Sequence, residues 1–126
     1  MKEQLARIIQ ETDWPFEKKG ETVLEVMAGF GRNYDVLEKK FKNIEMLDGS
    51  KELSDQNKHP VVKHVSYIQK WQWPSDMYDA VVGVFCLCYL KDSELAPVLQ
   101  KMENSLNDLG YIILMEPVLK PTETVH

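Results

Sequence analysis

Residues 22–33 read Thr-Val-Leu-Glu-Val-Met-Ala-Gly-Phe-Gly-Arg-Asn, and they are the most informative stretch of the chain. A short apolar run that contains Glu25 leads into a turn with Gly29 and Gly31, and a helical pattern begins at Asn33. Glycine permits a positive φ and lets a ligand approach the backbone, and the first N–H groups of a helix point at the same place. The pattern predicts a strand, a ligand-holding turn and a helix. On the glycines alone, an ordinary strand-to-helix loop remains an alternative.

A second strand is predicted at residues 43–48, which read Asn-Ile-Glu-Met-Leu-Asp. Its last residue, Asp48, follows the glycines by about twenty residues, the spacing at which a βαβ unit places a carboxylate against a ribose. Because parallel strands end at the same edge of a sheet, we expect the glycine turn and Asp48 to lie side by side.

The composition of the 126 residues is that of a globular protein, with 44% hydrophobic and 28% charged residues. This length predicts one domain over residues 1–126. No apolar run approaches the roughly twenty residues of a membrane span, and the N-terminus lacks the plan of a signal peptide. We therefore expect no membrane association and a location in the cytoplasm or nucleus. A net charge of −5 makes nucleic acid an unfavourable partner, because that partner requires a basic face.

The cysteines and histidines give no metal-binding pattern. Cys86 and Cys88 lie in one apolar run, where a strand would turn both to the same face as buried thiols. His59, His64 and His126 share no spacing with them or with each other. No metal site is predicted.

Helical and strand patterns alternate along the chain. Helices are expected at 2–12, 34–41, 50–58 and 92–106, strands at 23–26, 44–47, 61–68, 78–89 (with the last residues leaving the strand) and 111–115, and a glycine turn at 107–110. Strands that alternate with helices predict an α/β fold with a parallel sheet covered on two faces.

Five of these segments resemble, in order and spacing, the motifs of the class I S-adenosylmethionine-dependent methyltransferases. They are Glu-Val-Met-Ala-Gly-Phe-Gly at 25–31, Asp48, the loop from Gln69, Tyr-Asp at 78–79 and Leu-Gly-Tyr-Ile-Ile-Leu at 109–114. The resemblance covers residues 22–117. Ala-Gly-Phe-Gly-Arg, Ile-Gln-Lys-Trp and Tyr-Leu-Lys-Asp are further similar to segments of the protein α-N-terminal methyltransferases. The resemblance implies a Rossmann-like sheet of five mainly parallel strands in the order 3-2-1-4-5 and a cofactor-binding core at 22–117. The single domain is expected to have an N-terminal helix at 1–13 before this core and a tail at 118–126 after it.

The resemblance also implies a site for S-adenosylmethionine and its product S-adenosylhomocysteine. Glu25 would fix the turn or the cofactor's ammonium, Arg32 would reach its carboxylate and Asp48 would accept both ribose hydroxyls. The adenine would lie between Gly49 and Ser50 on one side and Ile68 and Gln69 on the other. The full set of implied residues is Glu25, Met27, Ala28, Gly29, Gly31, Arg32, Asp48, Gly49, Ser50, Ile68, Gln69 and Phe85, of which Phe85 begins the segment beneath the sulfonium. Taken singly, Glu25, Asp48 and Gln69 also fit structural roles in a cap, a strand end and a loop.

The chain departs from the family pattern in two places. Met27 stands where the family has the first glycine of the turn, so its side chain either points into the core or crowds the cofactor. The family has seven strands, whereas this chain stops about ten residues after its fifth, which would leave that strand as an exposed edge. A homodimer, a hetero-complex or a truncated chain would each account for this edge.

These features predict a methyltransferase that acts on a protein or small-molecule nucleophile, with a non-catalytic methyltransferase-like subunit as the alternative. Glu116, just after the fifth strand, is the nearest candidate for substrate contact, and it could equally be a solvated acid. Trp14, Trp71 and Trp73 would form either an aromatic cage for a cationic partner or, more often, half-buried lids over the sheet.

Overall fold

The computed structural model describes residues 2–12, 14 and 21–116, and its centre is a five-stranded parallel sheet in the order β3-β2-β1-β4-β5. This architecture confirms the predicted Rossmann-like fold class and strand order. The strands are β1 (Thr22–Val26), β2 (Asn43–Asp48), β3 (Val62–Val65), β4 (Tyr78–Val84) and β5 (Leu106–Met115), and the helices are α1 (Lys2–Glu11), α2 (Tyr34–Leu37), α3 (Lys51–Gln56), the 3-10 helix η2 (Leu87–Tyr89) and α4 (Asp92–Ser105).

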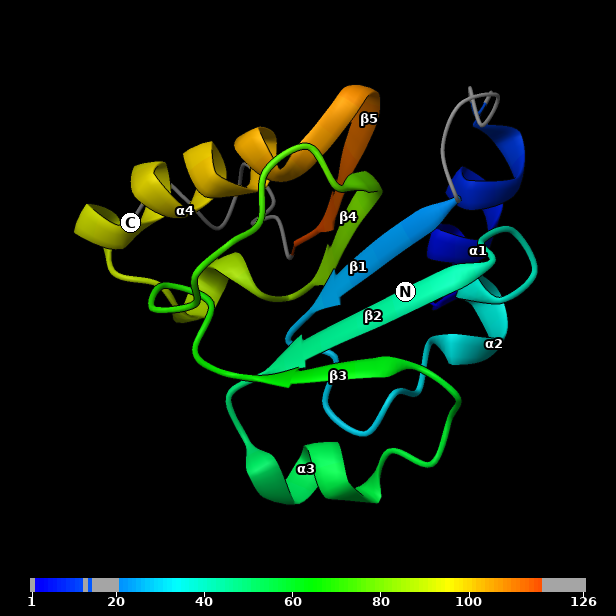
Figure 1. Ribbon diagram of the computed structural model, residues 1–126, viewed down its shortest axis with the longest axis horizontal. Coiled ribbons are helices and arrows are strands. Elements are labelled where there is room, and N and C mark those ends of the chain that lie inside the picture. The colour runs from blue at the N-terminus through cyan, green and yellow to red at the C-terminus, as the bar shows by residue number, and fades with distance from the viewer. Residues whose placement is uncertain (1, 13, 15–20, 117–126) are drawn as a thin grey trace, which may run out of the picture.

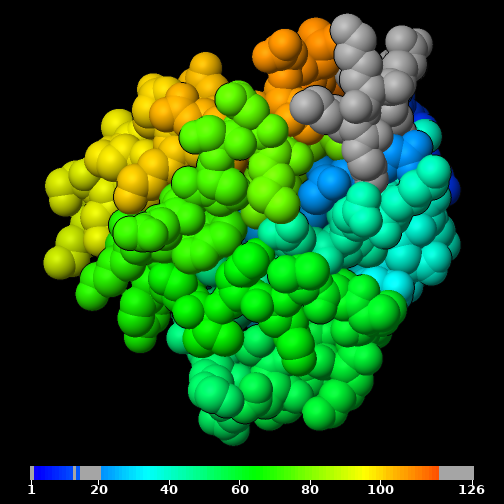
Figure 2. Space-filling view, viewed as in Figure 1, coloured from blue at the N-terminus to red at the C-terminus, as the bar shows by residue number. Residues whose placement is uncertain are grey.

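Helices cover both faces of the sheet, with α1 and α2 on one side and α4 on the other (Figure 1). Leu5 and Ile9 of α1 and Leu37 of α2 are buried against one face, and Val98 and Met102 of α4 are buried against the opposite face. The segment between β3 and β4 covers the remaining part of the second face, where its green side chains lie beside α4 (Figure 2). Burial of these apolar side chains in two layers is the main stabilising contribution to such a fold.

The parallel register brings the carboxyl ends of the central strands together. Glu25 on β1 pairs with Met46 on β2 and with Val82 on β4, so the turn after β1 lies between the ends of its two neighbours. The arrowheads of β1, β2 and β3 point to the same edge of the sheet (Figure 1). This is the edge at which open α/β sheets bind ligands.

A shared carboxylate joins three strands inside the second layer. One oxygen of Glu45 on β2 accepts a 2.8 Å hydrogen bond from the hydroxyl of Tyr78 on β4, and it lies 2.8 Å from Nε2 of His64 on β3. Burial and the neighbouring Glu45 carboxylate together raise the pKa of Tyr78. The network satisfies polar groups that would otherwise be costly to bury between these strands.

The predicted glycine turn at 107–110 is wrong, because β5 begins at Leu106 directly after α4. Asn107 is held against β4 by its side-chain amide, which donates to the carbonyl of Met77 at 3.3 Å and to Asp79 at 3.2 Å. The register with β4 shifts here, as in a β-bulge. A Cβ on Gly110 would lie 3.1 Å from the carbonyl oxygen of Tyr78, so this glycine provides space in the bulge.

Several predicted element bounds were too long. The third strand ends at Val65 and the fourth at Val84, and α2 ends after a single turn at Leu37. The next residue after β4, Phe85, has a φ of 56°, which an extended strand does not allow. The expected strand through both cysteines is therefore interrupted, and Cys86 is buried whereas Cys88 is exposed.

Candidate functional site

The turn after β1 has the backbone conformation that its glycines predict. Gly29 and Gly31 have φ values of 60° and 88°, which side chains disfavour, and a Cβ on Gly31 would lie 2.7 Å from the side-chain amide of Asn57. Met27 also has a positive φ of 52°, although it carries a side chain. A non-glycine residue in this region is strained, and such strain is concentrated at functional sites.

Asp48 connects this turn to the loop after β2. Its two carboxylate oxygens accept separate hydrogen bonds, from the backbone N–H of Gly29 at 3.0 Å and from the backbone N–H of Ser50 at 2.8 Å. The side chain of Ser50 is used locally, because its hydroxyl oxygen accepts the N–H of Leu53 as the cap of α3. The predicted meeting of the glycine turn and Asp48 is therefore present as a direct contact.

Glu25 lies beneath the turn and is only 2% exposed. Its Oε2 accepts a 2.7 Å hydrogen bond from the side-chain amide of Asn33, whereas its Oε1 is buried with no hydrogen-bond partner in residues 2–12, 14 and 21–116. Burial raises the pKa of Glu25 from 4.5 to about 7, against the opposing effects of the Asn33 hydrogen bond and the positive charge of Arg32. Arg32 itself is exposed to solvent. The sequence pattern indicated Glu25 but missed Asn33.

A cavity of about 270 Å³ lies beside the turn, at the carboxyl edge of the sheet. Four of the predicted residues line the cavity, namely Met27, Gly49, Ile68 and Gln69. Three further lining residues were not predicted from the sequence, namely Tyr67, Tyr89 and Leu90. The Tyr67 ring packs so closely on Gly49 that a Cβ there would lie 2.7 Å from a ring carbon. An aromatic residue directly before Ile68 was the available sequence signal for Tyr67, whereas Tyr89 and Leu90 depend on the path of the chain after β4.

Eight of the twelve predicted residues lie outside the lining of this cavity: Glu25, Ala28, Gly29, Gly31, Arg32, Asp48, Ser50 and Phe85. Of these, Ala28 and Phe85 make backbone hydrogen bonds to neighbouring strand ends. Ala28 is buried in the turn and donates its N–H to the carbonyl of Leu47. Phe85 directly follows β4 and donates its N–H to the carbonyl of Met115 at 2.7 Å. Both residues hold the strand ends in place, and the predicted contact of Phe85 with a sulfonium stays a prediction.

Glu116 is engaged with the segment after β4. Its Oε1 accepts the backbone N–H of Leu87 at 2.5 Å, and its Oε2 is buried without a hydrogen-bond partner among the described residues. Burial and the nearby Glu116 carboxylate raise the pKa of the Cys86 thiol to about 12, so Cys86 is an unreactive thiol at neutral pH. Glu116 thus anchors η2 to the end of β5 and is not a freely solvated acid.

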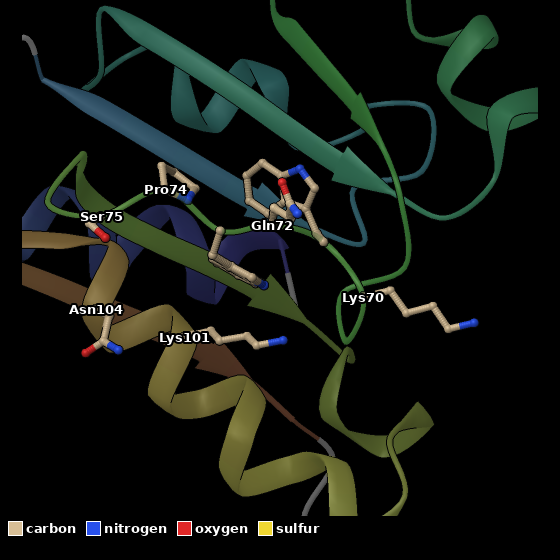
Figure 3. Close-up of a pocket in the computed structure, with 8 residues that line it drawn as sticks. Lys70, Gln72, Pro74, Ser75, Lys101 and Asn104 are labelled. Carbon is tan, nitrogen blue, oxygen red and sulfur yellow. The ribbon is translucent and has the colours of Figure 1, made fainter.

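A second groove, of about 340 Å³, separates the loop after β3 from α4 (Figure 3). Lys101 extends from α4 and donates to the carbonyl of Gln69 at 3.3 Å, and the indole N–H of Trp73 donates to the carbonyl of Ile68 at 3.1 Å. Lys70 points away from the other labelled side chains in Figure 3, and its ammonium lies 5.8 Å from the centre of the Tyr67 ring. The groove wall therefore fixes the backbone of two residues that line the first cavity.

The three tryptophans do not form one cage. Trp71 and Trp73 contact each other edge to face at 5.1 Å and are half-buried over the second layer, and Trp71 also lies 4.8 Å from the ring of His64. Trp14 packs in the first layer against Phe41.

Residues 2–12, 14 and 21–116 contain no cluster of His, Cys, Asp and Glu side chains that could hold a metal ion. The same residues contain no helix with the length and apolarity to cross a membrane.

Residues 1–124 match the sequence profile of a family described as a methyltransferase domain. The chain belongs to this methyltransferase family. No curated protein matches it.

Solved methyltransferases share the fold of this methyltransferase chain. Phosphoethanolamine N-methyltransferase 1 of Haemonchus contortus, in complex with phosphoethanolamine and S-adenosylhomocysteine, has a TM-score of 0.78 at 22% identity, over 97% of this chain and 28% of that one. An S-adenosylmethionine-dependent methyltransferase of Leishmania major has a TM-score of 0.78 at 22% identity, over 90% and 48%. An amino pentose methyltransferase of Micromonospora echinaspora, bound to S-adenosylmethionine, has a TM-score of 0.76 at 19% identity, over 98% and 52%. The chain thus spans about half or less of the length of these proteins.

Proposed function

We propose that this chain binds S-adenosylmethionine and S-adenosylhomocysteine at the carboxyl ends of β1 and β2, and that it works as a methyltransferase in the cytoplasm or nucleus. The observation that carries the proposal is the position of Asp48. Its two oxygens bond the glycine turn and the loop after β2, beside the 270 Å³ cavity. At about 270 Å³ the cavity is slightly smaller than the usual ligand cavities of about 300–1,000 Å³, so it would hold one part of the ligand and leave the rest outside.

The residues present fit the parts of this cofactor. An ionised carboxylate has about four acceptor positions, so Asp48 retains acceptors for two ribose hydroxyls after bonding two backbone N–H groups. The adenine would lie in the cavity against Tyr67 and Ile68, with the Gln69 amide as donor and acceptor for the base edge. The buried Glu25 has an unused oxygen for an ammonium group.

The cofactor, when bound, supplies a methyl group on a sulfonium. This chain contributes binding and orientation, because an attacking atom held at near-attack distance lowers the barrier without a covalent step on the protein. The Glu116 carboxylate is bonded to η2, which favours a positioning role for it over proton transfer. We propose a nitrogen or oxygen of a protein or small molecule as the acceptor, and the sequence resemblance favours a protein α-amino group among these.

Calorimetric titration with S-adenosylhomocysteine tests the cofactor proposal. Wild-type protein should bind it, and Asp48→Ala should weaken binding by about 1.5–3 kcal/mol, the range for hydrogen bonds to a charged group. Asp55→Ala is the matched control, because Asp55 is exposed and paired with Lys51 on α3. Absence of binding by the wild type at millimolar ligand would contradict the proposal.

A non-catalytic subunit is the second candidate, and the position of β5 favours it. Among the described strands β5 pairs with β4 alone, so it forms an edge of the sheet. Leu109 and Tyr111 on this strand are exposed, and such edges pair readily with another chain. We propose a homodimer or hetero-complex through β5. Radiolabel transfer from S-adenosylmethionine to lysate proteins separates the candidates: transfer by the isolated chain supports the enzyme, and cofactor binding without transfer supports the subunit.

A further inference from the structure

Asn33 stands at the start of α2 but does not use its side chain as a helix cap. Asparagine is among the best N-cap residues because its side-chain oxygen accepts a free N–H of the first turn, with a stabilisation of about 1 kcal/mol. The side chain of Asn33 makes no such bond. It is instead 4% exposed and donates its amide N–H to Glu25 at 2.7 Å. The residue therefore serves the strand end before it, eight positions back along the chain.

The bond leaves Glu25 with one committed and one free oxygen. The Asn33 amide fixes Oε2, while Oε1 is buried without a hydrogen-bond partner in the part of the chain that the structure describes. A buried acceptor without a donor is unfavourable by about 1–3 kcal/mol, so native proteins rarely retain one outside functional sites. A donor on a bound ligand would remove this cost, and an ammonium would also relieve the burial of the carboxylate's negative charge.

We infer that Asn33 is a positioning residue that orients Glu25, so that its free oxygen accepts a hydrogen bond from the ammonium of the cofactor's amino acid moiety. This inference rests on the proposed function. Asn33 should therefore affect recognition of the cofactor's ammonium group. It should not affect recognition of the nucleoside in the cavity of Tyr67 and Ile68.

The test compares two ligands that share the nucleoside. S-adenosylhomocysteine carries the amino acid, and 5′-methylthioadenosine lacks it. Asn33→Ser is the informative variant, because serine can cap α2 yet its hydroxyl is too short to replace the amide bond to Glu25. We expect Asn33→Ser to raise the Kd for S-adenosylhomocysteine about tenfold, as for the loss of one hydrogen bond to a charged group, with the Kd for 5′-methylthioadenosine within about twofold of the wild type.

Glu25→Gln provides the second variant and a double-mutant cycle. Because Asn33 acts through Glu25, adding Asn33→Ser to Glu25→Gln should weaken S-adenosylhomocysteine binding by less than Asn33→Ser does in the wild type. If Asn33→Ser melts below the assay temperature, Glu25→Gln alone carries the ligand comparison, with the same selective loss expected. Asp55→Ala again serves as the control.

The outcomes separate this inference from the proposed function. Wild-type protein that binds neither ligand would overturn both. Wild-type protein that binds both ligands, with variants that lose affinity for the two equally, would leave cofactor binding intact and overturn the positioning role, because a general disturbance of the turn affects both halves of the ligand. Selective loss of the amino acid ligand, together with a non-additive double mutant, supports it.

Discussion

Glu25→Gln is expected to remove a pH dependence of stability that one buried carboxyl group creates. Burial raises the pKa of Glu25 from 4.5 to about 7 in the folded protein. Between these two values the folded state binds more protons than the unfolded state, so the free energy of unfolding falls as pH rises, and it levels off above about pH 7. Glutamine has the same shape and one acceptor oxygen for Asn33, but it does not titrate.

The magnitude follows from the shift. One pKa unit corresponds to about 1.36 kcal/mol, so the interval from 4.5 to about 7 corresponds to at most about 3.4 kcal/mol. Part of the loss has already occurred near pH 5, where the unfolded chain is mostly ionised. The linkage relation then gives about 2.5 kcal/mol for the change between pH 5 and pH 8. The free energy of unfolding of Glu25→Gln, relative to that of the wild type, should therefore be higher at pH 8 than at pH 5 by about this amount.

Urea unfolding of both proteins at pH 5 and pH 8 provides the measurement. The quantity compared is the difference in the free energy of unfolding between variant and wild type, at pH 8 and at pH 5. All other titrating groups cancel in this comparison, because they are common to both proteins. A substitution that changes stability equally at the two pH values would refute the reasoning, since it would show that Glu25 titrates in the folded protein as it does in the unfolded chain.

Three further predictions concern the turn, the acid and the sheet edge. Met27→Gly should tighten S-adenosylhomocysteine binding in calorimetry, because Met27 lines the cavity. The free energy of unfolding should change by no more than about 1 kcal/mol, because relief of the positive φ of Met27 offsets the lost packing. Unchanged affinity together with a loss of about 2 kcal/mol or more in the free energy of unfolding would show that Met27 only fills the core. Asp48→Asn should lower unfolding stability by about 1–3 kcal/mol in urea, because one amide oxygen replaces two acceptors, and equal stability would show that both N–H groups find other partners. Ile112→Pro should reduce association in light scattering and should lower the melting temperature only by the stabilisation that association provides. Its effect is confined to the edge because the carbonyl of Met115 faces β4, so the backbone N–H of Ile112, three residues earlier, points to the free edge. A monomeric wild type would contradict the proposed interface, which as a specific contact should bury at least about 1,000 Å².

The sequence predicted those parts of the molecule that depend on local chemistry. The glycines at 29 and 31 and the acid at 48 follow from the needs of a tight turn and a strand end, and the structure brings them into contact. The strand order came from the family resemblance, and the structure confirms it. The turn expected at 107–110 was wrong because long-range bonds of Asn107 to the segment around β4 override the local preference of Gly110.

The missed site residues also depend on distant contacts. Tyr89 lines the cavity because η2 bends the chain back after β4, and apolar periodicity does not report such a bend. Asn33 is a residue type expected at a helix cap, and it stands at the start of α2. Its side chain bonds Glu25 on the preceding strand instead of capping the helix. Propensity describes what a residue favours in isolation, whereas a buried carboxyl group determines which donors near it are used.

The hydrogen bond from the Trp73 indole to the carbonyl of Ile68 makes this side chain an optical reporter of the cavity wall. Indole emission depends on the polarity and hydrogen bonding around the ring, so a ligand that displaces water from the wall or moves Ile68 would change the fluorescence of Trp73 without any attached label. Trp71 contacts Trp73 at 5.1 Å, so the emission of these two rings would report on the wall together. Trp14 lies in the opposite layer, and its emission would form a constant background. A chain of this size thus carries its own probe for rapid-mixing experiments, in which the order of ligand arrival and backbone adjustment can be followed in time.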